Sequence, residues 1–237
     1  MSSTLKDHLF HEILPALGKD AAYSPFARIK AAVAARKLGI ADNSLKVYLN
    51  EALKKGVIHD AGRGWYSRLS EPVPLDGKPV AKLIRTVEKA FPLLDFAVWS
   101  TVQLNPWMHH LLAQPVHFLH APADTLESVG EKLRTLGWEV AVNPPASTAP
   151  KLVRPGGKML VLRPSLGRQP APAGRQAAIE HMLVDLVAET GPLALMDQSE
   201  AQAVVAAVLD RNLVQIAPML RYAASRKNPI PALAAIN

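Results

Sequence analysis

Residues 24–68 read SPFARIKAAVAARKLGIADNSLKVYLNEALKKGVIHDAGRGWYSR, and this stretch decides the fold of the N-terminal part of the chain. After Tyr23-Ser24-Pro25, a helix start with proline in the first turn, apolar side chains recur at helical spacing until Gly39. A second helix is predicted from Asp42-Asn43-Ser44, because all three residues are good N-caps. An earlier repeat of the same spacing predicts one more helix around residues 5–17.

A tight basic hairpin follows these helices. Residues 57–60 and 65–68 are expected to form two strands, and Gly62 and Gly64 between them can take the positive φ that a tight turn requires. Arg63 is left at the tip of the turn. Two short helices followed by such a hairpin have the layout of a winged helix-turn-helix. A winged helix-turn-helix DNA-binding domain is therefore predicted for residues 1–72.

The helix that begins at residue 42 has two different faces. An inward stripe is formed by Leu45, Leu49, Ala52 and Leu53, which leaves a polar and cationic face on the opposite side. Side chains of that kind can reach base edges and phosphates in a major groove, and Arg63 can contact a phosphate or enter the minor groove. The predicted DNA-binding residues are Asn43, Ser44, Lys46, Val47, Asn50, Lys54 and Arg63. Three helices and a hairpin can also form a protein-docking module, which stays open as the alternative.

The composition is that of a folded protein whose positive charge is unevenly spread. The chain has 237 residues, 49% of them apolar, and a net charge of +7. Residues 1–70 hold eleven basic against six acidic residues, residues 71–150 six against eight, and residues 151–237 ten against six. Basic ends suit a nucleic-acid surface, although solubility alone also explains such an excess.

Several classes of protein are excluded or disfavoured by the same composition. No apolar run reaches the roughly 18 residues of a membrane helix, and the start of the sequence lacks a secretory signal pattern, so a cytoplasmic protein is expected. The chain has no cysteine, which excludes disulfides, thiolate zinc sites and thiol nucleophiles.

A second domain is predicted for residues 73–237, after a linker with three prolines between residues 72 and 79. Strands and helices alternate over 80–165, which predicts an α/β layer with some parallel pairing. The expected strands are 93–99, 116–120 and 138–142, with helices over 80–90 and 125–137, a helix opened by Pro106, and an edge hairpin of 151–154 with 158–162. Residues 174–237 are expected to be helical, over 175–189, from Asp197, and over 217–227. The predicted class is thus α+β and multidomain.

Catalytic patterns are incomplete along the chain. Asp95 could begin a metal-dependent nuclease site, but the next strand carries no carboxylate and no Glu-x-Lys follows. The Pro-Gly-Gly-Lys run at 155–158 lacks the glycine spacing of a phosphate loop, and the serines at 100 and 165 lack nucleophile-elbow glycines. We therefore expect no catalytic residues, no cofactor and no enzymatic activity.

Four histidines lie close together in sequence, at positions 109, 110, 117 and 120. Strand alternation places His117 and His120 on opposite faces, and adjacent His109 and His110 diverge by about 100° on a helix. Hydrogen-bonded, partly buried histidines are expected here, and no metal site is predicted.

Three motifs resemble a known family. The first is Leu94-Asp95-Phe96-Ala97-Val98-Trp99-Ser100-Thr101, followed by Leu104-Asn105-Pro106-Trp107-Met108-His109-His110, and the others span 179–186 and 220–227. Together with the predicted winged helix, they resemble the AbiEi-like antitoxins of type IV toxin-antitoxin (abortive infection) systems. The resemblance implies a bacterial repressor that binds inverted repeats of double-stranded DNA in its own promoter. It also implies that the C-terminal domain counteracts a nucleotidyltransferase-like toxin in phage defence, often without a stable direct complex.

The basic C-terminal helix is the candidate antitoxin surface, with Arg221, Arg226 and Lys227 able to contact DNA or the RNA substrate of the toxin, or simply to offset the helix dipole. The chain departs from the family pattern at His120-Ala121-Pro122-Ala123, where an acidic residue is expected, and at Ser225-Arg226-Lys227, where paired arginines are expected. The alternative function is a protein-interaction adaptor, or a transcription factor of phage defence that is not an antitoxin.

Overall fold

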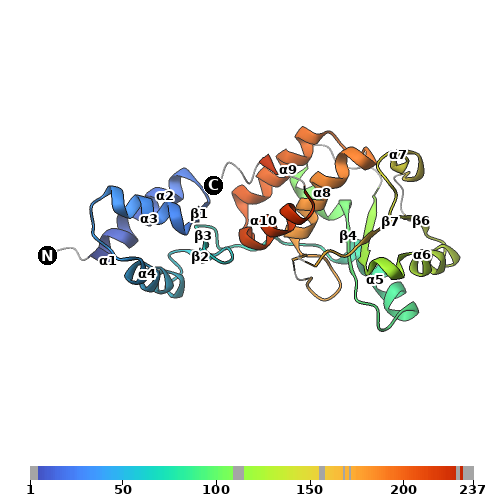
Figure 1. Ribbon diagram of the computed structural model, residues 1–237, viewed down its shortest axis with the longest axis horizontal. Helices are drawn as coiled ribbons and strands as arrows, with labels where there is room; N and C mark the ends of the chain where they lie inside the picture. Colours follow the sequence, from blue (N-terminus) through green and yellow to red (C-terminus); the bar gives the residue numbers. More distant parts are fainter. Residues whose placement is uncertain are drawn as a thin grey trace. The chain divides into compact units, whose positions relative to one another are not determined.

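The computed structural model describes residues 5–108, 115–154, 158–167, 169–170, 172–227 and 230–231. The described chain is a mixed α+β protein with two small sheets (Figure 1). It divides into two compact units. The first contains the described residues up to Val73 together with Val208–Leu220, and the second contains those of Pro74–Ala207 and Arg221–Ile230. Residues 208–220, which the sequence assigned to the C-terminal domain, thus belong to the first unit.

The N-terminal part of the first unit contains, in chain order, three helical stretches, a strand, two helices and a hairpin. These elements are α1 Leu5–His8, the π-helical turn η1 Leu9–Ile13, α2 Leu14–Asp20, β1 Tyr23–Pro25, α3 Phe26–Ala35, α4 Asp42–Lys54, β2 His59–Asp60 and β3 Trp65–Ser67. The three strands form an antiparallel sheet in the order β1-β3-β2. The predicted helices and hairpin are confirmed as elements.

Two local predictions for this unit were wrong. Tyr23-Ser24-Pro25 is a strand that pairs with β3, where only a helix start was expected. Proline is compatible with this position because β1 is an edge strand. The N-cap of α4 is Ala41, and no side chain caps the helix, so Asp42 lies in the first turn instead.

The core of the first unit follows the predicted helical stripes. Its buried side chains are Leu9, Phe10, Ile13, Leu14, Ile29, Val33, Leu45, Leu49, Ala52 and Ile58. Segment 212–217 is hydrogen-bonded to β1 and to the turn between β2 and β3. The Tyr23 hydroxyl donates to the carbonyl of Asn212 and accepts from the Val214 amide at 3.0 Å, and the Ala217 amide donates to the Ala61 carbonyl at 3.3 Å.

The second unit is built around a four-stranded sheet in the order β4-β5-β7-β6. Its elements are α5 Lys78–Ala90, β4 Ala97–Ser100, the 3-10 helix η2 Thr101–Trp107, β5 His117–Ala121, η3 Ala123–Thr125, α6 Leu126–Thr135, β6 Glu139–Val142, α7 Ala149–Leu152, β7 Met159–Pro164 and α8 Ile179–Leu193. Helices α9 Gln198–Arg211 and α10 Ile216–Ser225 contribute residues to both units. β5 and β6 both run parallel to β7, which confirms the predicted parallel pairing, and β4 is antiparallel to β5.

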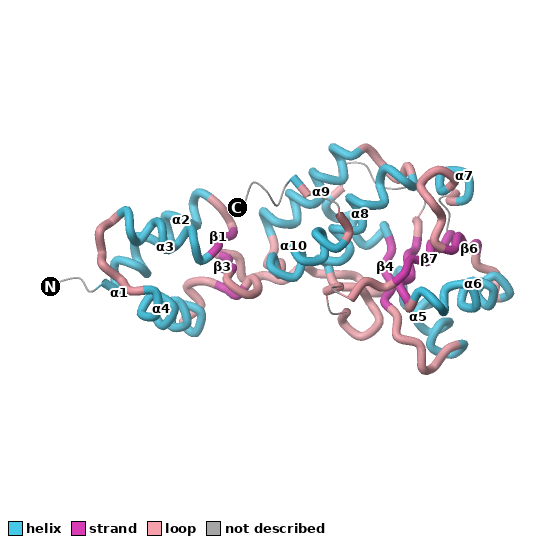
Figure 2. Tube along the Cα trace, viewed as in Figure 1, coloured by secondary structure: helices cyan, strands magenta, loops and turns pink. Residues whose placement is uncertain are grey.

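Helices cover both faces of this sheet, with α5 and α6 on one side and α8 on the other (Figure 2). The α5–α6 side is packed by alternate strand residues such as Val98, Leu119 and Leu162. On the other side Trp99 stacks on Phe118 with ring centroids 4.3 Å apart. In the described part of the chain, no helix has both the length and the apolar character needed to cross a membrane.

Four predicted elements of the second unit differ in the structure. The edge hairpin was wrong, because residues 149–152 form α7 and β7 is a central strand that pairs with β5 and β6. The first strand is limited to Ala97–Ser100, and Leu93 is 98% exposed. Helix α8 begins at Ile179 instead of 175 and continues through Pro192, because a proline in the last turn costs only one backbone hydrogen bond. A helix opened by Pro106 was predicted, but Pro106 lies near the end of the 3-10 helix η2, and Met108 after it is extended. His109 and His110, which the predicted helix would carry, lie outside the described residues.

Candidate functional site

The first candidate surface is the outer face of α4 and the turn of the hairpin. All seven residues predicted to contact DNA are exposed. Val47 stands out among them because it is an apolar side chain with 54% exposure on an otherwise polar face. The structure brings six of the seven together on one helix, whereas Arg63 lies on the turn between β2 and β3.

Acidic side chains on α4 are neutralised by lysines of neighbouring helices. Asp42 accepts from Lys30 at 2.8 Å, and Glu51 is paired with Lys6. The hydrogen bond from Lys6 lowers the pKa of Glu51, so this carboxylate stays ionised at neutral pH. Lys46 lies over the Phe26 ring, with its Nζ 5.8 Å from the ring centroid. The outer face of α4 therefore presents Lys46 and Lys54 without a net acidic neighbour.

The turn of the hairpin is held in a fixed conformation. Gly62 and Gly64 have φ values of 92° and 78°, as the sequence predicted. The Gly62 amide donates to Asp60 Oδ1 at 3.1 Å, and a Cβ at position 62 would lie 2.9 Å from side-chain atoms of Ala217 and Pro218. Arg63 is exposed at the tip of this packed turn.

The second candidate site is a buried polar cluster centred on Asp185 of α8. Its Oδ2 lies 2.9 Å from Nε2 of His120 on β5 and 2.9 Å from Nε2 of His181, one helical turn earlier. Its Oδ1 accepts from the Tyr222 hydroxyl at 2.8 Å and lies 3.1 Å from Nε of Arg226. The side chains of His120, His181 and Asp185 are each 1% exposed. One buried carboxylate thus organises residues from three elements.

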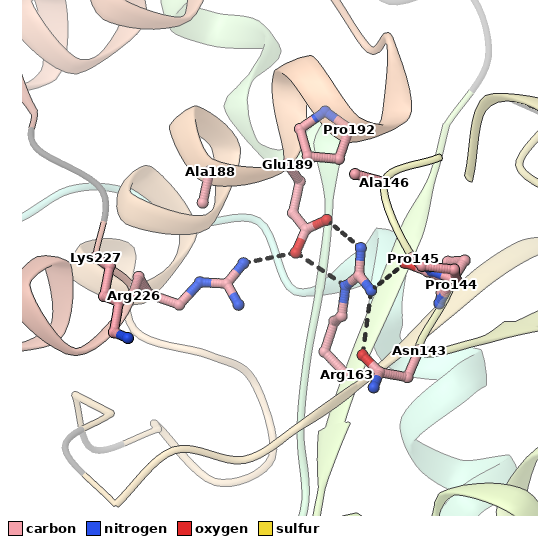
Figure 3. A pocket seen from close by; sticks show the side chains of 10 residues that line it. All are labelled: Asn143, Pro144, Pro145, Ala146, Arg163, Ala188, Glu189, Pro192, Arg226 and Lys227. Atoms are coloured by element: carbon pink, nitrogen blue, oxygen red, sulfur yellow. Dashed lines mark hydrogen bonds and ion pairs between the residues drawn. The ribbon is translucent and has the colours of Figure 1, made fainter. Parts of the chain in front are cut away.

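Glu189 continues this cluster toward the surface. Arg163 of β7 makes a bidentate pair with Glu189, at 2.9 Å from Nε and 2.5 Å from Nη2, and Arg226 donates to the same carboxylate at 2.6 Å (Figure 3). The remaining Arg163 donors bond Asn143 Oδ1 at 3.2 Å and the Pro144 carbonyl at 2.8 Å. Two arginines therefore balance the charges of Asp185 and Glu189.

Burial and pairing fix the protonation states in the cluster. Burial lowers the pKa of His120, which favours the neutral imidazole. Burial alone would raise the pKa of Asp185, but the facing His181 and His120 outweigh it and hold this pKa well below its ordinary range. Burial likewise raises the pKa of Tyr222. Burial would lower the pKa of Arg226, yet the carboxylates of Asp185 and Glu189 raise it.

Two cavities adjoin the cluster. One of about 480 Å³ is lined by Arg163, Glu189, Arg226 and Lys227 together with residues 143–146 (Figure 3). The other, of about 430 Å³, is lined by Gln169, His181, Ser165 and Pro122, among others. Both ends of the polar cluster therefore face a space that a small molecule or ion could enter.

The predicted antitoxin residues divide between surface and interior. Arg221 and Lys227 are exposed. The side chain of Arg226 is only 17% exposed and is paired with two buried carboxylates, so its first role is inside the second unit. His117 contacts Trp138 edge-on, on the opposite side of β5 from His120, which confirms the predicted alternation.

Sequence reasoning missed most of the buried cluster, including Arg163, His181, Asp185 and Glu189. A signal was present in α8. Glu180, His181, Asp185 and Glu189 are ionisable residues inside a helix whose other side chains are mostly apolar, and the last three follow at intervals of four. Intervals of four place side chains on one helix face. All four are buried.

A protein family described as a family of unknown function (DUF6577) matches residues 44–235 of this chain. The chain belongs to the DUF6577 family. The matched region includes nearly all of α4, the hairpin and the buried cluster. Neither the curated proteins nor the solved structures contain a match. The description of DUF6577 assigns no activity, so the function of this member is argued from its own residues.

Proposed function

We propose that the first unit is a winged helix-turn-helix that binds double-stranded DNA, with α4 as recognition helix and the β2–β3 hairpin as wing. The observation that carries the proposal is the outer face of α4, where polar and cationic side chains surround one exposed valine. Such a face has no core to pack against, and its chemistry matches that of a major groove.

The order of elements supports this proposal. A helical stretch, an edge strand, two helices and a hairpin follow one another, and β1 completes the hairpin sheet by pairing with β3. This arrangement holds α4 against the core through Leu45, Leu49 and Ala52 and leaves the other side free. Of the described residues on that side, Asn43, Ser44 and Lys46 occupy the first turns, where backbone amides and the helix dipole favour a phosphate.

In this proposal, some side chains contact bases and others contact phosphates. Asn50 can bond the edge of an adenine, and Val47 can contact a thymine methyl group. Lys46, Lys54 and Arg63 supply positive charge for phosphates, or in the case of Arg63 for a narrow minor groove. Because phosphate contacts carry no sequence information, specificity in this proposal rests on Val47 and Asn50.

The wider role that we propose is an autoregulatory antitoxin. It rests on the resemblance to AbiEi-like antitoxins, which implies repression of the protein's own promoter and neutralisation of a nucleotidyltransferase-like toxin. Of the three predicted antitoxin residues, Arg221 and Lys227 are exposed and can contact a partner or RNA, whereas Arg226 is held by Asp185 and Glu189.

A mobility-shift experiment with DNA from upstream of the gene tests the DNA-binding proposal. The wild-type protein should bind this fragment in a salt-sensitive manner, and the double variant Lys46→Ala/Asn50→Ala should lose most of that binding. Lys82→Ala is the matched control, because Lys82 is an exposed lysine of α5 in the second unit. Absence of salt-sensitive binding by the wild type would leave the protein-docking module as the better account of the first unit.

Co-expression with the toxin encoded beside the gene tests the antitoxin role separately. The protein is expressed from an unrelated promoter, so that repression plays no part. The Lys46→Ala/Asn50→Ala variant should still restore growth, and Arg221→Ala/Lys227→Ala should restore it less well. Growth arrest that persists with the wild-type protein would remove the antitoxin role and leave DNA binding untouched.

A further inference from the structure

We propose that His120, His181 and Asp185 form a binding site for a divalent transition-metal ion of the zinc class. The observation is the convergence of two imidazole nitrogens and one carboxylate oxygen inside the second unit. These ligand atoms all lie within 4.8 Å of one another and come from buried side chains. The site is distinct from the proposed DNA-binding face, which belongs to the first unit.

The contact between His120 and Asp185 is poorly aligned for a hydrogen bond. Among the described residues, Nε2 of His120 and Oδ2 of Asp185 have no hydrogen bond of acceptable geometry, although they lie 2.9 Å apart. Buried polar atoms normally find a partner, and an ion is one of the few explanations when they do not. A cation between the three side chains would satisfy both atoms at once.

The surrounding residues provide the support that a metal site needs. Nδ1 of His120 lies 3.1 Å from the side-chain amide of Gln169. The oxygen and nitrogen of such an amide can be interchanged. With the oxygen toward Nδ1, His120 keeps its proton there and directs the Nε2 lone pair at the site. The Tyr222 hydroxyl donates to the other oxygen of Asp185 and so orients the carboxylate. Outer contacts of this kind are typical of metal ligands.

The donor set selects the class of ion. Two imidazole nitrogens with one carboxylate oxygen suit zinc and related transition metals, whereas magnesium and calcium prefer oxygen alone. Zinc bonds of about 2.0–2.2 Å place neighbouring ligands roughly 3.3 Å apart, so the two 2.9 Å contacts must open slightly.

A cavity beside His181 and the net charge of the cluster determine what the fourth ligand can be. His181 also lines the cavity of about 430 Å³, which provides a route for the ion and for a fourth ligand. Since Arg163 and Arg226 already balance Asp185 and Glu189, a bound dication leaves the cluster positive. We therefore expect hydroxide or another anionic group to enter from the cavity as the fourth ligand.

The test is zinc binding by the full-length, tag-free protein after treatment with a chelator. Titration with zinc chloride against a competing chromophoric chelator should give one site per chain. His181→Asn should weaken binding by more than about 100-fold, beyond the roughly 10–100-fold that the loss of an outer contact usually costs. His117→Asn is the matched control. It removes a buried imidazole from β5, the strand that carries His120, but from the opposite face of that strand. It should bind zinc like the wild type.

Two further measurements make the result decisive. His8→Asn controls for an adventitious surface site, because His8 lies beside Glu12 on an N-terminal helical turn. Cobalt added to the wild-type protein should give the visible absorption of a four-coordinate site with nitrogen and oxygen ligands, and this readout does not depend on any variant folding. The proposal is overturned if the wild type binds no stoichiometric zinc, if folded His181→Asn binds it as tightly, or if only His8→Asn weakens it.

Discussion

The effect of replacing a charged side chain of the second unit on the free energy of unfolding depends on whether that charge is buried. Glu189 is 2% exposed and holds both Arg163 and Arg226. We predict that Glu189→Gln lowers the free energy of unfolding by about 3–5 kcal/mol, since it leaves two guanidinium groups without their shared counter-charge. Chemical denaturation measures this change.

The same substitution at an exposed carboxylate is the control. Glu88 lies 3.8 Å from Arg175, and its side chain is 49% exposed. Glu88→Gln should change the free energy of unfolding by about 0–1 kcal/mol, because solvent screens such a pair. Equal effects of the two substitutions would show that the Glu189 cluster contributes nothing special to stability.

Among the structural elements, the hairpin turn offers a matched pair of glycines. Gly62 and Gly64 both have positive φ, but a Cβ at position 62 would meet Ala217 and Pro218, whereas one at position 64 meets nothing within 4 Å. Gly64→Ala should cost about 1–2 kcal/mol from backbone strain alone. Gly62→Ala should cost clearly more, as measured by thermal unfolding. Indistinguishable melting temperatures would mean that segment 215–218 does not pack on the turn in solution.

The sequence patterns predicted most of the segments that form helices and strands, but not which strands pair. Helices α4, α5 and α6 were predictable because their apolar residues repeat at a period that only a helix satisfies. Strand β7 was predictable as a strand, but its central place was not, since periodicity carries no information about which strands pair. Residues of β7 are buried on both faces, which is the burial expected of a central parallel strand.

The buried cluster was hidden for a related reason. His120 and Asp185 are separated by 65 positions in the sequence, and only the packing of α8 on the sheet brings them to 2.9 Å. The interval of four between His181 and Asp185 was visible, but it is equally compatible with a solvated helix face. Of the histidines chosen from sequence proximity, His120 belongs to the site and His117 does not, while His109 and His110 lie outside the described residues.

At the scale of the whole molecule, a segment near the C-terminus packs in the N-terminal unit, which the sequence did not predict. Residues 208–220 belong to the first unit, and Tyr23 bonds both the Asn212 carbonyl and the Val214 amide. Tyr23→Phe should destabilise the first unit by about 1–3 kcal/mol, because a buried amide and carbonyl lose their partner.

Amide hydrogen exchange tests this prediction, because it measures the protection of each unit separately. Amides of β1 and β3 should exchange faster in Tyr23→Phe, while amides of α5 and α6 in the second unit should keep their protection. A uniform loss of protection across both units would contradict the assignment of segment 208–220 to the first unit.

The central claim, that the outer face of α4 contacts DNA phosphates and bases, is tested most directly by the salt dependence of affinity. Binding of the upstream fragment is measured by fluorescence anisotropy over a series of salt concentrations for wild type, Lys46→Ala and the control Lys82→Ala. We predict that log K falls linearly with log salt, and that Lys46→Ala reduces the slope by about one while Lys82→Ala leaves it unchanged. An unchanged slope for a folded Lys46→Ala variant would contradict the account.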